Sequence, residues 1–186
     1  ISQPIKGTSA RYENPDLDSE SSKTLITDKK NQSENLMIVD LLRNDLGRVC
    51  KVGSIKVSRL FELQSFSNVH HLVSTIEGKL ADGLNGADVL QACFPGGSIT
   101  GAPKIRAMQI IDELENNRRS IYCGSTVYFS AHGAMDSNIM IRTVLLHKDK
   151  VYCCGGGGIV ADSKCESEYN ESIGKISSLL SALNNR

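Results

Sequence analysis

Acidic side chains at two places in the sequence could act together on a metal ion. Glu34 follows Ser33 near the start of an expected helix, and Glu168 and Glu171 are three residues apart in another expected helix. Residues with this spacing lie on one face of a helix. Carboxylates without nearby histidine or cysteine ligands suit a hard cation such as Mg²⁺. An ordinary solvated acidic face has the same spacing, so both interpretations stay open.

Two glycine-rich segments could bind an anion. Residues 94–104 (FPGGSITGAPK) contain Ser98 and run into an amphipathic helix, with Pro103 in its first turn. A second run, Gly155 to Gly158, follows an apolar segment that we expect to be a strand. Glycine lets backbone N–H groups turn toward a ligand, and a helix N-terminus favours a carboxylate or phosphate. A tight loop, a bulge or a crowded chain crossing needs the same glycines, so these alternatives also stay open.

Four basic or titratable side chains have positions that suggest chemistry. Arg142 interrupts an apolar segment expected to be a strand, and a buried guanidinium requires an anionic partner, from the protein or from a ligand. His70 and His71 are adjacent in an expected strand, so their side chains point to opposite faces. A structural role is expected by default for such a histidine, and an acid–base role is the alternative. Lys6 lies in an expected turn; it would become a nucleophile if burial beside other cations lowered its pKa.

The elements that must position these residues are helices alternating with long strands. Residues 9–33 are polar and show no sustained periodicity, which predicts a loop. Apolar residues recur at helical spacing over residues 33–42, 87–93, 104–114 and 165–183. Strands are expected over residues 52–66, 69–80, 122–131, 137–146 and 150–154. Long hairpins with helices between them indicate the α+β class with largely antiparallel sheets.

The composition argues against several classes of function. Lys and Arg number 21, as do Asp and Glu, so a broad charged surface for nucleic acid or an anionic membrane is not expected. No apolar stretch reaches the length of a membrane span. The six cysteines show neither metal-ligand spacing nor a compact disulfide pattern, which favours reduced thiols. We therefore expect a cytoplasmic protein, with a plastid as the alternative.

Several ordered blocks of the sequence resemble the chorismate-utilising enzymes, the family of anthranilate synthase component I. The resemblance implies a layered α/β/β/α sandwich, of which residues 1–186 would be the C-terminal portion of a single catalytic domain, incomplete on its N-terminal side. The blocks cover nearly everything except residues 9–33, and they are PIKGT (4–8), ENLMIVDLLRNDLGR (34–48), VHHLVSTI (69–76), PGGSITGAPKIRAM (95–108), IRT (141–143), GGGIVADS (156–163) and EYNE (168–171).

Within this family Lys6 points to one branch. The PIKGT motif is similar to that of the aminodeoxychorismate synthases, whereas anthranilate synthases usually carry PIAGT. The resemblance implies conversion of chorismate to 4-amino-4-deoxychorismate for 4-aminobenzoate and folate synthesis, with ammonia from a glutamine amidotransferase subunit or fused domain. The Lys6 amine would form a covalent intermediate at C2 of chorismate. The alternatives are anthranilate synthase component I, or an inactive fragment that only binds chorismate or a partner.

The resemblance also assigns metal and proton-transfer roles. It implies that Glu34 and Glu171 bind Mg²⁺, that Glu168 holds a metal-bound water, and that His71 is an acid–base or orienting group. The family often has an acid where this chain has Asn31. We expect this departure to weaken metal binding.

The remaining assignments concern the substrate. The resemblance implies that the enolpyruvyl carboxylate is held by Arg142, Tyr128 and the backbone amides of Gly156, Gly157 and Gly158, and that Ser98 belongs to a loop closing over the ring. A glycine usually precedes the tyrosine matched by Tyr128, and here Val127 stands in that place. A β-branched residue there is expected to crowd the carboxylate pocket.

Overall fold

The computed structural model describes residues 1–184. The chain divides into two compact units, Ile1–Ser98 (the first unit) and Ile99–Arg186 (the second unit). Every strand pair in the described residues is antiparallel, and helices lie between the strands in sequence. The predicted α+β class is therefore confirmed. Among residues 1–184, no helix combines the length and the apolar character needed to cross a membrane.

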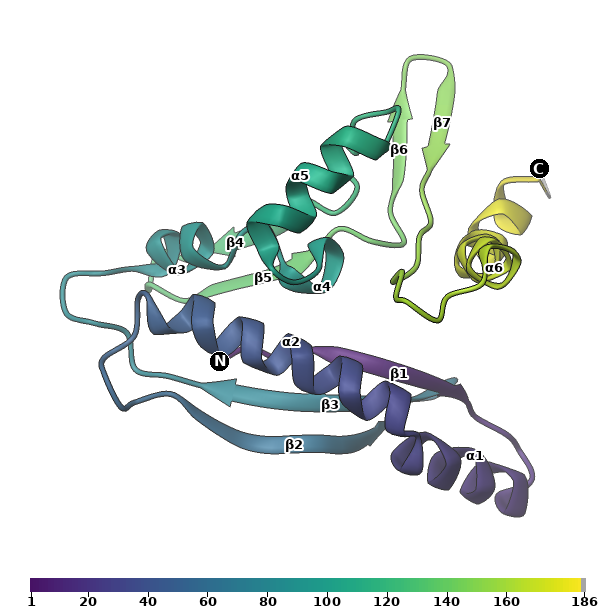
Figure 1. Cartoon of the computed structure of the whole chain (residues 1–186), viewed down its shortest axis with the longest axis horizontal. Coiled ribbons are helices and arrows are strands. Elements are labelled where there is room, and N and C mark those ends of the chain that lie inside the picture. The colour runs from purple at the N-terminus through teal and green to yellow at the C-terminus, as the bar shows by residue number, and fades with distance from the viewer. Residues whose placement is uncertain (185–186) are drawn as a thin grey trace. The chain divides into compact units, whose positions relative to one another are not determined.

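The first unit contains a three-stranded sheet. Its strands are β1 (Ile5–Ala10), β2 (Lys56–Ser65) and β3 (Val69–Glu77), in the spatial order β1-β3-β2, as Figure 1 shows. The long strands expected over residues 52–66 and 69–80 are confirmed but are shorter. The backbone at Gly53 has φ +75°, which turns the chain before β2 can begin.

Two helices replace the loop predicted for residues 9–33, and that prediction is wrong. Helix α1 (Pro15–Thr27) begins after Asn14, whose side chain accepts hydrogen bonds from the backbone N–H groups of the first turn. Helix α2 (Lys29–Gly47) begins after Asp28, whose carboxylate accepts the N–H of Asn31 at 3.0 Å. Capping side chains mark where these helices begin, whereas the apolar periodicity on which the sequence prediction relied is weak there.

The core of the first unit lies between α2 and the sheet (Figure 1). Val39, Leu46 and Ile76 form its centre. Full burial of side chains of this size stabilises a fold by about 1.5–3 kcal/mol each. A polar contact crosses the same interface: the fully buried Asn35 donates from Nδ2 to the Leu72 carbonyl at 3.1 Å. This interface fixes α2 against β3.

The glycine-rich segment begins at the end of the first unit. Helix α3 (Gly86–Cys93) precedes it, as expected, and a short helix α4 (Gly97–Thr100) contains Ser98. A Cβ on Gly97 would lie 2.8 Å from Leu41 Cδ1, so a larger residue would collide with α2. Gly101 has φ +108°. Close packing and backbone conformation therefore account for these two glycines, which favours the tight-loop interpretation.

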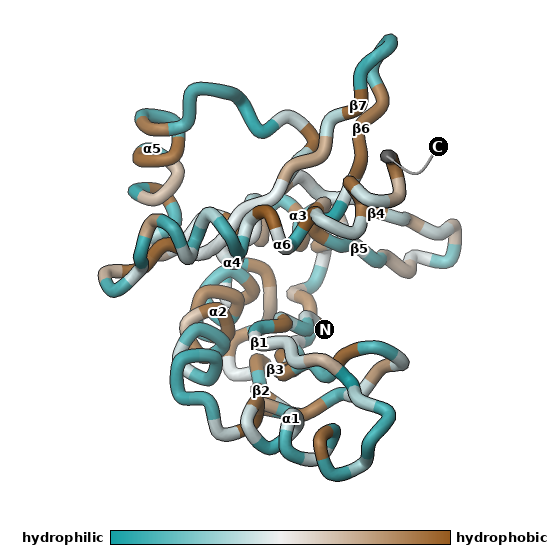
Figure 2. Tube along the Cα trace, turned by 90° about the vertical axis from the view of Figure 1, so that its right-hand side faces the viewer, coloured by the Kyte–Doolittle hydropathy of each residue, from teal (hydrophilic) through white to brown (hydrophobic). Residues whose placement is uncertain are grey.

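The second unit consists of two hairpins and two longer helices. Hydrophobic and hydrophilic residues alternate along α5 (Figure 2), yet no residue of α5 is buried. Pro103 is the N-cap of α5 rather than a residue of its first turn. The elements are α5 (Lys104–Leu114), β4 (Ser125–Phe129) paired with β5 (Met135–Ile139), β6 (Val144–His147) paired with β7 (Lys150–Cys153), and α6 (Cys165–Asn184).

The single strand predicted over residues 137–146 is wrong. Arg142 has φ +53°, a left-handed conformation that interrupts the extended backbone. Strand β5 therefore ends at Ile139, and β6 begins at Val144 as a separate strand. Arg142 is exposed rather than buried, so the expectation of a buried guanidinium that requires an anionic partner is also wrong.

Candidate active site

Lys6 lies on β1 and contacts a carboxylate on α2. Its Nζ donates to Oε2 of Glu34 at 3.3 Å, and the two side chains are 24% and 26% exposed. The expected turn at residues 4–8 is a strand instead. The neighbour of Lys6 is an acid rather than the other cations that the sequence interpretation considered. The amine and one proposed metal ligand therefore meet within the first unit.

Gly7 permits the close approach that makes this contact possible. It has φ +89°, and a Cβ there would lie 3.0 Å from Leu25 Cδ1 and 3.1 Å from Asn31 Cβ. A side chain at this position would push α1 and α2 away from β1. Glu34 lies beyond the first turn of α2, because this helix begins at Lys29 rather than at Ser33.

His71 is held by the strand that carries Lys6. Thr8 of β1 is paired in register with His71 of β3, and the Thr8 hydroxyl lies 2.9 Å from His71 Nδ1. The Phe66 ring contacts the imidazole edge-on, with centroids 5.5 Å apart. These contacts orient the half-buried imidazole and leave Nε2 as the ring nitrogen outside the Thr8 contact. Such an arrangement suits an acid–base or orienting group.

His70 points to the opposite face of β3, as predicted, and has a structural role. It is 3% exposed, with Nε2 3.0 Å from Asp18 Oδ1 and Nδ1 2.8 Å from the Ser65 hydroxyl. The backbone N–H of Tyr12, followed by the Arg11 guanidinium, lowers the pKa of Asp18 to about 2. Asp18 is therefore ionised at neutral pH, and its carboxylate accepts a hydrogen bond from the N–H at His70 Nε2. This bond ties α1 to the sheet.

Asn35 is a positioning residue that the sequence analysis missed. Its Oδ1 accepts the Ser74 hydroxyl at 2.6 Å, in addition to the bond from Nδ2 to Leu72. Asn35 follows Glu34 in the sequence, and Leu72 follows His71. Their hydrogen bond therefore fixes the backbone beside both candidate site residues. A polar side chain within the apolar sequence NLMIVDLL was the available signal.

The second group of candidate residues lies where the glycine run crosses α6. A Cβ on Gly155 would lie 2.6 Å from the Ser172 carbonyl oxygen, and one on Gly157 would lie 3.0 Å from Glu168 Oε2. The crowded-crossing interpretation is thus correct for these two glycines. A Cβ on Gly156 would meet the Tyr122 hydroxyl at 2.8 Å, whereas Gly158 has no atom within 4 Å of that position.

Glu168 and Glu171 lie on one side of α6, as predicted, and both approach Gly157. Glu168 Oε1 accepts the Ser163 hydroxyl at 2.6 Å, and Oε2 is buried without a hydrogen-bond partner among the described residues. Glu171 Oε1 accepts from Lys175, whose Nζ also donates to the Gly156 carbonyl at 3.1 Å. Lys175 was missed by the sequence analysis, although its spacing from Glu171 is typical of a helical ion pair.

These carboxylates have the donor chemistry that Mg²⁺ requires. A buried carboxylate oxygen without a partner is costly, and a hard cation would satisfy Glu168 Oε2. Glu34 belongs to the first unit, and Glu168 and Glu171 belong to the second. Within residues 1–184, no three His, Cys, Asp or Glu side chains come close enough together to hold a metal ion. The residue types fit Mg²⁺, and the metal site stays a prediction.

The remaining predicted substrate-binding residues lie at separate positions in the chain. Tyr128 is 63% exposed on β4, opposite Asp136 of β5. Ser98 is half-buried in α4. In the part of the chain that the structure describes, no hydrogen bond or ion pair joins Tyr128 or Arg142 to the acidic residues of α6. Their roles in substrate binding therefore stay predictions.

Comparison with known proteins adds independent findings. The family model described as chorismate binding enzyme matches residues 1–181. The aminodeoxychorismate synthase component 1 of Salmonella typhimurium is 54% identical over 183 residues, which cover 98% of this chain and 40% of that protein. The anthranilate synthase component 1 of Aquifex aeolicus is 45% identical over 181 residues, covering 97% of this chain and 37% of that protein.

A solved structure has the same fold. The crystal structure of anthranilate synthase component I from Streptococcus pneumoniae superposes with a TM-score of 0.82 at 38% identity, covering 95% of this chain and 43% of that chain. This likeness confirms the fold type predicted from the sequence. The chain spans about 40% of the length of these relatives.

Proposed function

The chain belongs to the family of chorismate binding enzymes, and from this membership we propose that it converts chorismate and ammonia to 4-amino-4-deoxychorismate. The similarity to aminodeoxychorismate synthase component 1 supports this reaction, and the similarity to anthranilate synthase component 1 makes anthranilate formation the alternative. Lys6 favours the first reaction, because an alanine at this position could not form a covalent intermediate.

The proposed first step is attack of the Lys6 amine on C2 of chorismate. As the carbon–nitrogen bond forms, both ring double bonds shift by one position and the bond from C4 to its hydroxyl breaks. The amine loses a proton, and the departing hydroxide gains one and leaves as water. We assign the transfer of one of these protons to His71, and the contact with Thr8 at 2.9 Å, which orients its ring, supports this assignment.

In the proposed second step ammonia attacks C4. Both ring double bonds shift back and the bond between C2 and the lysine nitrogen breaks. The nitrogen at C4 loses a proton, and the departing lysine nitrogen gains one, so that Lys6 regains its amine. No pyruvate is lost, in contrast to anthranilate formation. Two easier substitutions thus replace one difficult exchange of hydroxyl for amine.

Other residues would bind the substrate and supply charge. Arg142, Tyr128 and the amides of Gly156 to Gly158 would hold the enolpyruvyl carboxylate, with Ser98 near the ring. Glu34 and Glu171 would bind Mg²⁺, and Glu168 would hold a water bound to the metal. The ion would supply positive charge for the ring carboxylate and for the charge that develops during substitution.

The ammonia would come from a glutamine amidotransferase. The name of the Salmonella relative includes the words component 1, which implies a further component for that protein. We extend this arrangement to the present chain, with the amidotransferase as a separate subunit or a fused domain.

The observation that carries the proposal is the placement of the Lys6 amine. It lies 3.3 Å from the Glu34 carboxylate, on the same strand whose Thr8 contacts His71. A potential nucleophile, a proposed metal ligand and a potential proton carrier thus occur together in the first unit.

Mass spectrometry of the intact protein tests the proposal. The protein is incubated with chorismate and Mg²⁺ but no ammonia source, and the products are mapped by peptide. We expect an adduct of chorismate less one water on the Lys6 peptide, absent from Lys6→Arg. Formation of anthranilate and pyruvate on addition of ammonia, without an adduct, would support the alternative. Chorismate binding with no adduct and no product would support a binding role alone.

A further inference from the structure

The contact between Lys6 and Glu34 brings together two groups with different proposed roles. Lys6 Nζ lies 3.3 Å from Glu34 Oε2. The proposed nucleophile therefore donates a hydrogen bond to an oxygen that would also bind the metal. We infer that the Lys6 ammonium pairs with the Glu34 carboxylate in the metal-free protein, and that Mg²⁺ displaces Lys6 when the metal binds to Glu34. This inference rests on the proposed function, since it assumes that Glu34 is a metal ligand.

The geometry makes simultaneous binding of Lys6 and Mg²⁺ to Glu34 unfavourable. Mg²⁺ binds carboxylate oxygens at about 2.0–2.1 Å, much closer than the lysine nitrogen. A divalent ion on Glu34 therefore stands within a few ångströms of the ammonium. Both side chains are about three-quarters buried (24% and 26% exposed), so water screens their repulsion only in part. A partly exposed lysine–carboxylate pair is weak, and the divalent ion wins the competition.

The competition links metal loading to release of the amine. While Lys6 is bound to Glu34, its nitrogen is directed at the carboxylate rather than at a substrate. Mg²⁺ on Glu34 turns the nitrogen away from this oxygen. Because such coupling is reciprocal, the factor by which Lys6 weakens metal binding is also the factor by which the metal weakens the Lys6–Glu34 contact. Metal binding would thus precede the covalent step.

Glu171 provides a contrast in the second unit. It also accepts a hydrogen bond from a lysine, Lys175, but that ammonium has a second partner in the Gly156 carbonyl. Lys175 therefore keeps a hydrogen bond if the carboxylate turns to a metal. For Lys6, the Glu34 contact is the single hydrogen bond that its Nζ makes within the described residues. We therefore expect Mg²⁺ binding to change the contacts of Lys6 more than those of Lys175.

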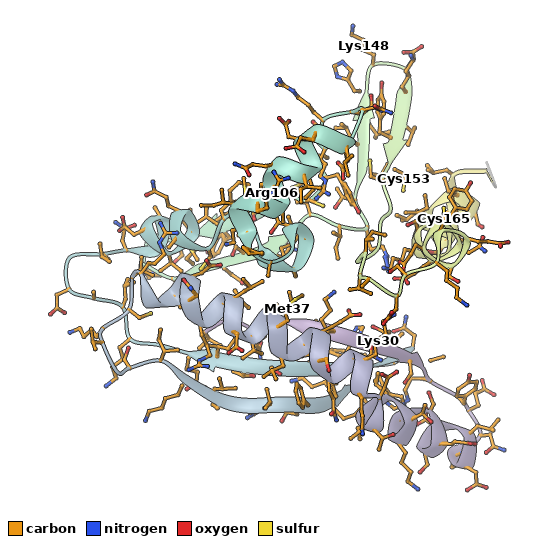
Figure 3. The ribbon with its side chains drawn as sticks, in the orientation of Figure 1. Lys30, Met37, Arg106, Lys148, Cys153 and Cys165 are labelled. Carbon is orange, nitrogen blue, oxygen red and sulfur yellow. The ribbon has the colours of Figure 1, made fainter. Side chains whose placement is uncertain are left out.

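Calorimetric titration of the intact protein with Mg²⁺, without chorismate, tests the inference. Lys6→Met keeps the length of the side chain and removes the ammonium, so we expect its Mg²⁺ affinity to rise about tenfold over the wild type. Lys30→Met is the matched control, because Lys30 is an exposed lysine on α2, one turn before Glu34 (Figure 3). We expect Lys30→Met to change the affinity less than about twofold. Equal affinities for Lys6→Met and the wild type would overturn the inference, as would equal gains in both variants.

Glu34→Gln separates failure of the inference from failure of the proposed function. If Glu34→Gln does not weaken Mg²⁺ binding, Glu34 is not a metal ligand, and the metal assignment of the proposed function fails. If Glu34→Gln weakens binding while Lys6→Met matches the wild type, the inference alone is wrong.

A second measurement uses the wild-type protein and does not depend on how a variant folds. The protein is acetylated briefly at constant pH with and without Mg²⁺, and each lysine is quantified by peptide mapping. We expect Mg²⁺ to raise modification of Lys6 several-fold and to leave Lys30 unchanged. Unchanged modification of Lys6 at saturating Mg²⁺ would overturn the inference.

Discussion

The two units of the chain position their candidate site residues by different means. In the first unit a helix and a sheet bury one another, and Leu72 and Ile76 are fully inaccessible. In the second unit, as far as residue 183, Cys123 and Ile176 are the buried apolar residues, each 9% exposed. Ile105 of α5 is 76% exposed. The first unit therefore has a core of its own, and the second consists mainly of local hairpins and helices.

This difference indicates which contacts fix the positions of the candidate site residues in each unit. Lys6 and Glu34 belong to elements that are anchored in the core of the first unit. Glu168 and Glu171 are placed instead by the close passage of a glycine segment along α6. We expect substitutions in the first unit to change chemistry or global stability. Substitutions in the second should change metal binding with less effect on unfolding.

Among the substitutions that test this difference between the units, those at Lys6 are expected to have the largest effect on activity. Lys6→Ala and the charge-conserving Lys6→Arg should both lower formation of 4-amino-4-deoxychorismate by about a thousandfold or more, because neither side chain can form the covalent intermediate. The assay measures product from chorismate and an ammonium salt in the intact protein. Wild-type turnover in either variant would remove Lys6 from its role as nucleophile.

The next largest effect is expected in the core of the first unit. Asn35→Leu leaves the Leu72 carbonyl without its partner and deprives the Ser74 hydroxyl of its acceptor. We expect the free energy of unfolding to fall by about 2–4 kcal/mol. Ile105→Ala in the second unit is the comparison and should cost under about 0.5 kcal/mol. Urea unfolding measures both, and equal losses would contradict the proposed difference between the units.

A smaller effect is expected at the acidic residues of α6. Glu171→Gln removes a proposed metal ligand, so the Mg²⁺ concentration that gives half-maximal activity should rise about tenfold or more. Its unfolding free energy should stay close to that of the wild type, since Glu171 is about half exposed. An unchanged Mg²⁺ titration would count against Glu171 as a ligand.

Gly157→Ala sharpens the comparison within the second unit. Its Cβ would lie 3.0 Å from Glu168 Oε2 and would displace that carboxylate. We expect Mg²⁺ affinity, measured by calorimetry, to fall about fivefold. Gly174→Ala in α6 is the control: no atom lies within 4 Å of its Cβ position, and alanine should stabilise the helix by about 0.5–1 kcal/mol. Equal metal affinities in the two variants would show that the crossing does not position Glu168.

The smallest expected effect is on acid stability of the first unit. The pKa of Asp18 in the folded protein, about 2, lies below its ordinary value of 3.8. This carboxylate therefore stabilises the fold fully above about pH 4, and the contribution is lost as the pH falls toward 2. Asp18→Asn should flatten the dependence of the urea midpoint on pH over this window. Identical pH profiles for the variant and the wild type would contradict the assignment.

The sequence predicted the elements that have strong apolar patterns. The β2–β3 hairpin, α3, α5, β7 and α6 occur where periodicity placed them, with ends shifted by a few residues. Helix α1 was missed because Leu25 is its one buried residue within the described chain, and its start depends on the Asn14 cap. The break at Arg142 was missed because a positive φ at a residue other than glycine has no signal in the sequence.

The sequence suggested a set of candidate site residues but not how they are arranged. The spacing of Glu168 and Glu171 is enough to place them on one helical face. The contact between Lys6 and Glu34 depends on the space that Gly7 leaves for α2, and no periodicity encodes such an approach between distant segments. The residues of α6 that approach Gly155 and Gly157 could likewise be identified only from the three-dimensional path of that helix.

Position 6 lies on β1 and is not one of the residues of the apolar cluster at the centre of the first unit. The strand is held by its backbone ladder to β3 and by the close approach at Gly7, and neither requires a particular side chain at the preceding residue. Replacing Lys6 with the alanine found in the related PIAGT motif would therefore leave the fold intact while removing the nucleophile. The proposed nucleophile can therefore be lost through one codon without a compensating change in the fold. On this view, enzymes of this family could diverge in chemistry faster than they diverge in architecture.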